Sequence, residues 1–187
     1  LATTGTGAGL GGHWHLDEGT GSAIMDASDS GLAGTVQGSA WTAGMRGSAL
    51  SFTGAPSTVT AGVPTTAVDN WTLSAWIYPA SLNQEGFAVA NGDDDGPPGD
   101  GGGYSFGVAN GGGGAGGKLT GIYSFVSYLD SGYTFPAANA WYHVAMVRSG
   151  GTLRWYVNGR QLPATSALTP IAPTGKLWIG SLKGIRF

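Results

Sequence analysis

The sequence predicts an all-β fold in which two antiparallel sheets pack face to face as a sandwich. Helical periodicity is almost absent, and short runs of β-branched and aromatic residues recur between clusters of Gly, Pro, Asn and Asp. Residues 71–78 alternate so that successive side chains point to opposite faces, one toward a core and one toward solvent. A chain of 187 residues with 41% hydrophobic content can bury one core, so we expect a single domain over residues 10–187.

The expected strands follow one another along the whole chain. They lie at residues 13–16, 35–36 together with Trp41, 49–52, 58–60, 71–78, 87–90, 104–108, 118–123, 142–148, 152–157 and 176–179. Asn158-Gly159 supplies the positive φ angles of a tight hairpin turn, and Ser149-Gly150-Gly151 separates two further antiparallel strands. Residues 91–103 and 110–117 are too rich in Gly, Asp and Pro for regular structure and are expected as loops.

The first residues suggest a tail and an exported protein. Residues 1–9 are a low-complexity segment, expected as a flexible or partner-binding tail. The chain starts at Leu1 rather than Met, which suggests that a leader has been removed. It has no Cys and is rich in Gly, Thr and Ser, which fits a secreted or cell-surface location.

Charge and hydropathy exclude two classes of partner. The formal net charge is -3, so no basic field exists to attract nucleic acid. No run of about 18 apolar residues occurs, so we expect no membrane insertion.

Several motifs resemble the laminin-G-like family of concanavalin-A-like jelly rolls. They are Gly-Gly-His-Trp-His-Leu-Asp-Glu-Gly-Thr-Gly at 11–21, an Asp-rich turn at 25–34, Gly-Ser-Ala-Leu-Ser-Phe-Thr-Gly at 47–54, Trp-Thr-Leu-Ser-Ala-Trp-Ile-Tyr-Pro at 71–79, and the hairpin pair at 141–148 and 153–159. The resemblance implies a two-sheet antiparallel jelly-roll sandwich. It departs from the family's pattern at the closing strand, of which only residues 184–187 remain.

The resemblance also implies calcium near the loop after the first strand. Asp17, Asp26 and Asp29 lie where such ligands would be, and calcium prefers several oxygen ligands. The alternative is that Asp26 and Asp29 only cap turns through their side chains.

A second acidic group occupies the loop after residue 91. Asp93, Asp94, Asp95 and Asp100 lie within eight positions, which fits either a solvated loop or a calcium or ligand rim. Their spacing is not that of an EF-hand.

Aromatic residues offer a possible glycan-facing surface. We expect most of the seven Trp residues in the core, in particular Trp76 and Trp155, which lie in the middle of strands. Tyr123, Phe125, Tyr128 and Tyr133 form a looser cluster near a loop, where a sugar-binding face is expected if there is one.

No catalytic constellation is evident in the sequence. A glycosidase needs two facing carboxylates, and the chain has only Glu18 and Glu85, far apart in sequence. We therefore expect no enzyme but a non-catalytic extracellular structural or adhesive module, stabilised by calcium and assembling into a filament with other copies of itself or binding surface proteins and glycans. A carbohydrate-binding, lectin-like module is the alternative, and a glycoside hydrolase is the least favoured.

Overall fold

The computed structural model describes residues 9–54, 56–93, 102–112, 114–123 and 127–180, which form fourteen strands and no helix. The all-β prediction is confirmed. Because these residues contain no helix, none of them forms a helical membrane span.

The larger sheet has eight antiparallel strands. In spatial order they are β1 (Ala23–Ile24), β2 (Gly34–Gln37), β5 (Thr58–Gly62), β14 (Lys176–Ile179), β7 (Gly86–Asn91), β8 (Tyr104–Ala109), β9 (Lys118–Tyr123) and β10 (Ser127–Thr134). The last strand of the sequence, β14, lies in the middle of this sheet, where it pairs with β5 and β7.

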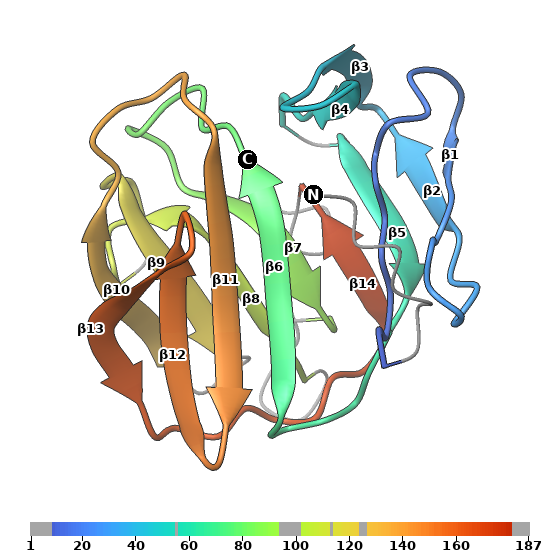
Figure 1. Cartoon of the computed structure of the whole chain (residues 1–187). Helices are drawn as coiled ribbons and strands as arrows, with labels where there is room; N and C mark the ends of the chain where they lie inside the picture. Colours follow the sequence, from blue (N-terminus) through green and yellow to red (C-terminus); the bar gives the residue numbers. More distant parts are fainter. Residues whose placement is uncertain (1–8, 55, 94–101, 113, 124–126, 181–187) are drawn as a thin grey trace.

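The smaller sheet has four antiparallel strands and lies in front of β7 to β10 (Figure 1). Its order is β13 (Arg160–Ser166), β12 (Thr152–Val157), β11 (Tyr142–Ser149) and β6 (Trp71–Ile77). A separate hairpin joins β3 (Ala40–Ala43) to β4 (Ser48–Ser51). The two sheets form the expected sandwich.

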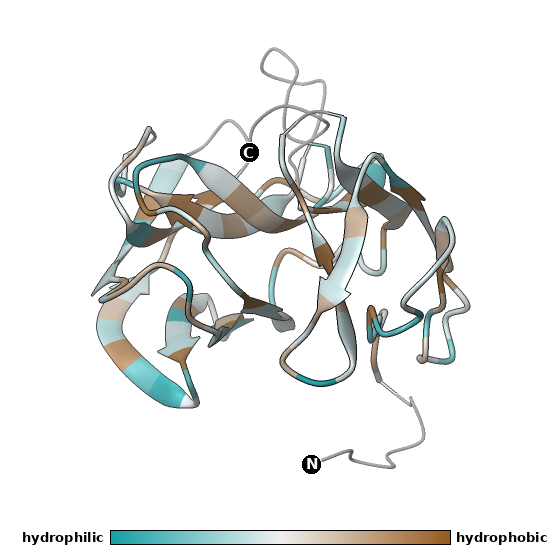
Figure 2. Cartoon of the chain, turned by 90° about the horizontal axis from the view of Figure 1, so that it is seen from above, coloured by the Kyte–Doolittle hydropathy of each residue, from teal (hydrophilic) through white to brown (hydrophobic). Residues whose placement is uncertain are grey.

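The core lies between the two sheets. Phe106 and Leu119 of the larger sheet pack in one cluster with Val144, Met146 and Trp155 of the smaller sheet, and each is at most 1% exposed. Polar and apolar positions alternate along the strands (Figure 2). A Cβ atom at Gly121 would lie 2.6 Å from Trp155 Cη2, so this strand position needs glycine to admit the indole. The core position predicted for Trp155 is confirmed.

Two of the predicted hairpin turns are confirmed. Asn158 and Gly159 have φ angles of 49° and 78°, and they connect Val157 to its cross-strand partner Arg160. Gly150 and Gly151, with φ angles of 58° and 73°, close the β11–β12 hairpin in the same way. Positive φ at both central residues matches the twist of the flanking strands.

The expected first strand at residues 13–16 does not form. Only an isolated bridge joins Trp14 to Asp26. Leu16 has a φ of 57°, which turns the chain out of the extended conformation. Strands β1 and β10 were not predicted, and for β13 the Asn158-Gly159 turn before it was predicted but not the extent of the strand. Strand β13 contains Pro163 and lies at the edge of its sheet, the position where proline is tolerated.

Strand β6 is the other edge of the smaller sheet. It pairs with β11, and no other described strand pairs with it. Its inward-facing residues Leu73, Ala75 and Ile77 are only partly buried, whereas Val144 and Met146 of β11 are fully buried. The core therefore opens to a groove beside β6.

Candidate functional site

Aromatic side chains gather at one end of the outer face of the smaller sheet. Trp76 and Tyr78 are 50% and 46% exposed. The His143 ring lies 5.3 Å from the Trp76 ring at an interplanar angle of 58°, and Trp141 lies 5.3 Å from Tyr78 at 56°. Strands β6 and β11, together with the residues next to their ends, thus present four rings on one face, and we call these four residues the aromatic cluster.

The strand pattern explains why these rings face outward. Leu73, Ala75 and Ile77 of β6 face the core, so Trp76, which alternates with them, must face solvent. In register, His143 of β11 lies opposite Trp76. The prediction that Trp76 is a core residue is therefore wrong. The sequence did carry the signal, because Trp76 shares its face with the polar residues Thr72 and Ser74.

The outer face continues across β11 and β12. Ala145 lies between Ser74 of β6 and Tyr156 of β12, so a small side chain separates the aromatic cluster from Tyr156. The Tyr156 hydroxyl donates to Gln161 Oε1 at 3.0 Å. Arg154 is the next outward-facing residue of β12 after Tyr156. Among the described residues, the outward positions of the four strands of the smaller sheet contain no Asp and no Glu.

A groove with a volume of about 2240 Å³ runs beside the free edge of β6. Trp76, Tyr78 and Trp141 line it on the side of the smaller sheet. Residues near the N-terminus also line the groove, among them His13 and His15, whose rings lie 4.5 Å apart. This volume exceeds the roughly 300–1,000 Å³ of pockets for single small molecules, and the groove is widely open to solvent.

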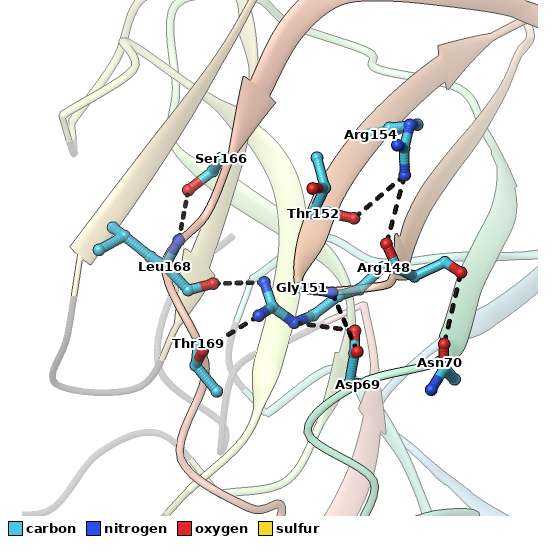
Figure 3. Close-up of polar contacts among 10 residues, drawn as sticks. Asp69, Asn70, Arg148, Gly151, Thr152, Arg154, Ser166, Leu168 and Thr169 are labelled. Atoms are coloured by element: carbon cyan, nitrogen blue, oxygen red, sulfur yellow. Dashed lines mark hydrogen bonds and ion pairs between the residues drawn. The ribbon is translucent and has the colours of Figure 1, made fainter.

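The opposite end of the smaller sheet is held by a buried arginine (Figure 3). Arg148 is 3% exposed, and its Nε lies 3.3 Å from Asp69 Oδ1. Its other nitrogens donate to Leu168 O and to Thr169 Oγ1. Asp69 also accepts a hydrogen bond from Gly151 N at 3.0 Å. The ion pair therefore fixes the β11–β12 hairpin against two loops.

Two buried tyrosines, Tyr104 and Tyr123, pack against Trp71, the cross-strand partner of Arg148. Burial raises the pKa of Tyr104 to about 12, although Asn91 opposes the shift, and Tyr104 stacks on Trp71 with ring centroids 3.7 Å apart. Burial also raises the pKa of Tyr123, against the lowering effect of Arg148. Both phenols stay neutral and act as packing groups near neutral pH.

The structure does not gather the predicted calcium ligands. No group of three or more His, Cys, Asp or Glu residues that could hold a metal ion occurs within the described part of the chain. Asp26 instead caps a turn: its carboxylate accepts hydrogen bonds from His13 N, Ser28 N, Ser28 Oγ and Leu32 N at 2.8–2.9 Å. Asp17 and Asp29 are exposed. The turn-capping alternative thus describes Asp26.

The electrostatics of Asp26 follow from these contacts. Desolvation by burial would raise the pKa of this carboxyl, but the hydrogen bonds from His13, Ser28 and Leu32 outweigh it and lower the pKa to about 2. A carboxylate that accepts several backbone N–H groups is stabilised in its charged form.

The second acidic group is only partly described. Asp94, Asp95 and Asp100 lie outside the described residues. Asp93 Oδ1 accepts from Trp178 Nε1 at 2.6 Å and from Lys176 N at 3.1 Å. Asp93 therefore joins its loop to β14.

The predicted glycan-facing aromatics are not one surface. Tyr123 is 0% exposed and belongs to the core, so its predicted exposure is wrong: it faces inward from β9 and its ring lies edge-on to Trp71. Phe125 lies outside the described residues. Tyr128 is 38% exposed on β10, and Tyr133 is partly buried against Phe135.

Solved structures of similar fold come from glycan-hydrolysing enzymes. Domain 4 of AbnA, an extracellular GH43 arabinanase from Geobacillus stearothermophilus solved in complex with arabinotriose, is 19% identical with a TM-score of 0.65, and the match covers 91% of this chain and 82% of that one. Trypanosoma rangeli sialidase is 18% identical with a TM-score of 0.65. That match covers 96% of this chain but 29% of the sialidase, so the chain spans less than a third of that enzyme.

These similarities correct two expectations. The similar structures belong to an arabinanase and a sialidase. They contradict the expected non-catalytic structural or adhesive role, with its filament. They also contradict the expectation that the chain is not an enzyme. At 18–19% identity the likeness itself establishes a shared fold.

A search of curated proteins finds no match to this chain. A family model described as the concanavalin A-like lectin/glucanases superfamily matches residues 52–186, which is most of the chain. The match includes β6, β11 and β12, the strands that carry the outer face described above. With the antiparallel sandwich and this match together, the chain belongs to the concanavalin A-like lectin/glucanases superfamily.

Proposed function

We propose that this domain recognises a glycan as part of a glycan-hydrolysing enzyme, and that the aromatic cluster contacts the glycan. The observation that carries the proposal is the exposure of Trp76 and Tyr78 beside His143 and Trp141. Large aromatic side chains are usually buried, and an exposed group of them commonly marks a binding site.

The chemistry of the outer face suits a sugar. An aromatic ring offers a broad apolar surface to the C–H groups of a sugar ring, while nearby polar groups bond to its hydroxyls. Thr72 and Ser74 supply hydroxyls beside Trp76 on the same strand. The groove next to Trp76 gives a longer glycan chain room to continue past the edge of β6.

The similarity in fold supports the same assignment. The arabinanase domain that this chain resembles was solved with arabinotriose, and the match covers 82% of that domain. Because that arabinanase is extracellular, we propose an extracellular location for this protein as well.

Titration calorimetry with arabino-oligosaccharides and with sialyl-oligosaccharides tests the proposal. Trp76→Ala should weaken binding at least tenfold, since truncating a central aromatic contact commonly costs about 2 kcal/mol or more. Tyr128→Ala is the matched control, because Tyr128 is also exposed but lies on β10 of the other sheet. Equal affinity of Trp76→Ala and wild type, or a loss only in Tyr128→Ala, would rule out the aromatic cluster.

The same glycans serve in a hydrolysis assay for newly formed reducing ends. Two carboxylates, Asp17 and Glu85, line the groove, and Glu85 Oε2 accepts a hydrogen bond from Gly114 N at 3.0 Å. Glycan hydrolysis requires a pair of carboxyl groups. Activity that is lost in both Asp17→Asn and Glu85→Gln would assign cleavage to the groove of this chain. Binding without cleavage would assign cleavage to another part of the enzyme.

A further inference from the structure

Beyond the aromatic cluster, Tyr156 and Arg154 stand together on the outer face of β12. They are two residues apart on one strand, so their Cα atoms lie about 7 Å apart and their side chains leave the sheet on the same side. We propose that Tyr156 and Arg154 form a subsite for a carboxylated sugar unit, such as a uronic acid. This inference rests on the proposed function, because it names the class of glycan that the same face selects.

On the β11 side, the residues beside this subsite are apolar. Ala145 lies opposite Tyr156 and Val147 lies opposite Arg154 on the neighbouring strand β11. Neither side chain is long enough to cover the ring or the guanidinium. A sugar ring can therefore lie on Tyr156 with its carboxylate directed toward Arg154.

The polar groups of the subsite are donors. Arg154 Nη1 donates to Ser149 O and Thr152 O, both at 3.4 Å (Figure 3). These contacts direct the side chain along the hairpin, and a guanidinium with five N–H groups keeps donors for a ligand. Gln161 accepts from the Tyr156 hydroxyl through Oε1, which leaves its amide nitrogen as a donor.

Within the described part of the chain, no carboxylate side chain lies on this face to repel a carboxylated ligand. The outward positions of β6, β11, β12 and β13 hold no Asp or Glu within the described residues, although the whole chain carries 11 acidic and 8 basic residues. Asp69, near the same hairpin, is paired with the buried Arg148. Arg–carboxylate pairing is charge-assisted and stronger than bonding to a neutral group, so a free acid should be preferred over its ester.

A matched pair of ligands tests this preference. Trigalacturonate and its fully methyl-esterified form share one backbone, and esterification replaces each charged carboxylate with a neutral methyl ester. By titration calorimetry at low salt, the wild-type chain should bind the acid at least tenfold more tightly than the ester, and the difference should shrink in 0.5 M salt because screening weakens exposed charge pairs.

Three variants assign the preference to one residue. Arg154→Gln should abolish the difference between acid and ester, whereas Arg154→Lys should keep part of it. Arg160→Gln is the control, since it removes the same charge from the exposed β12–β13 turn and should keep the full difference. Melting curves establish that each variant is folded before its affinity is compared.

The outcomes separate this inference from the proposed function. Equal binding of acid and ester by the wild type, or an unchanged preference in Arg154→Gln, would overturn the subsite. If neutral glycans still bound in a Trp76-dependent manner, the proposed function would stand without it. If no glycan bound and Trp76→Ala had no effect, both would fail.

Discussion

Replacing Asp26 with Asn should destabilise the fold by about 2 kcal/mol at pH 7. In the native turn, Oδ1 accepts from His13 N and Ser28 N, and Oδ2 accepts from Ser28 Oγ and Leu32 N. An Asn amide has one oxygen, so at least one backbone N–H must face an NH₂ group that cannot accept. Leaving a partly buried donor unsatisfied costs about 1–3 kcal/mol. For a domain of this size the melting temperature should fall by about 4–8 °C.

The effect should depend on pH in a defined direction. The folded pKa of Asp26 is about 2, below the ordinary value of 3.8, so its stabilising effect is complete above pH 5 and is lost as the pH falls toward 2. After allowance for solvent screening, this amounts to about 1–2 kcal/mol. The Asn variant lacks this contribution, so the unfolding free energies of variant and wild type should converge at acid pH.

Urea unfolding followed by tryptophan fluorescence at pH 7, 5, 3 and 2 measures both effects. Asp29→Asn is the control, because Asp29 is exposed in the same turn and should change stability by less than about 0.5 kcal/mol. Two results would refute the assignment of this carboxylate as the cap of the turn. One is an Asp26→Asn variant as stable as wild type at pH 7. The other is a difference in unfolding free energy that stays constant down to pH 2.

Three further predictions concern stability. Trp155→Ala should cost about 3–5 kcal/mol in chemical denaturation, because the indole is 1% exposed between the sheets; a cost below 1 kcal/mol would contradict its packing. Asp69→Asn should destabilise the fold more than Arg148→Met. The Asn variant leaves the Arg148 guanidinium buried without its counter-ion, whereas the Met variant leaves unpaired only Asp69, which is 33% exposed. The reverse order would argue against the ion pair as the dominant contact. If calcium binds near the first turn, a chelator should lower the melting temperature, and superimposed melting curves with calcium and with chelator would exclude a stabilising site.

The strand pattern of the sequence was enough to predict much of this fold. Alternation in β6, the Asn158-Gly159 turn and the Gly150-Gly151 turn are local features, and each depends on φ preferences or on the period of two of a strand. They predicted an antiparallel sandwich and the hairpins of the smaller sheet. The short β1 lacks such a local signal and was missed, and for the proline-containing β13 only the preceding turn was predicted, not the extent of the strand.

The candidate site was harder to predict, because exposure depends on which face of a strand meets the other sheet. Trp76 and Trp155 both lie in the middle of strands, yet one is 50% exposed and the other 1%. Trp76 shares its face with the polar Thr72 and Ser74, whereas Trp155 shares its face with Leu153 and Val157. Likewise Tyr123 was predicted to face a glycan and is buried against Trp71. Hydrophobicity alone does not distinguish these residues, because the same type of aromatic side chain occurs both in protein cores and on protein surfaces.

The sequence by itself determined the class of structure, its antiparallel hairpins and the burial of Trp155. Only the tertiary structure decided that Asp26 caps a turn, that Arg148 pairs with Asp69 across 79 positions of sequence, and that the rings of Trp76 and His143 meet on one face. The physical reason is that local patterns fix the direction of each side chain relative to its own strand. Which distant strand it meets, and whether water or protein covers it, depends on how the two sheets are ordered and packed.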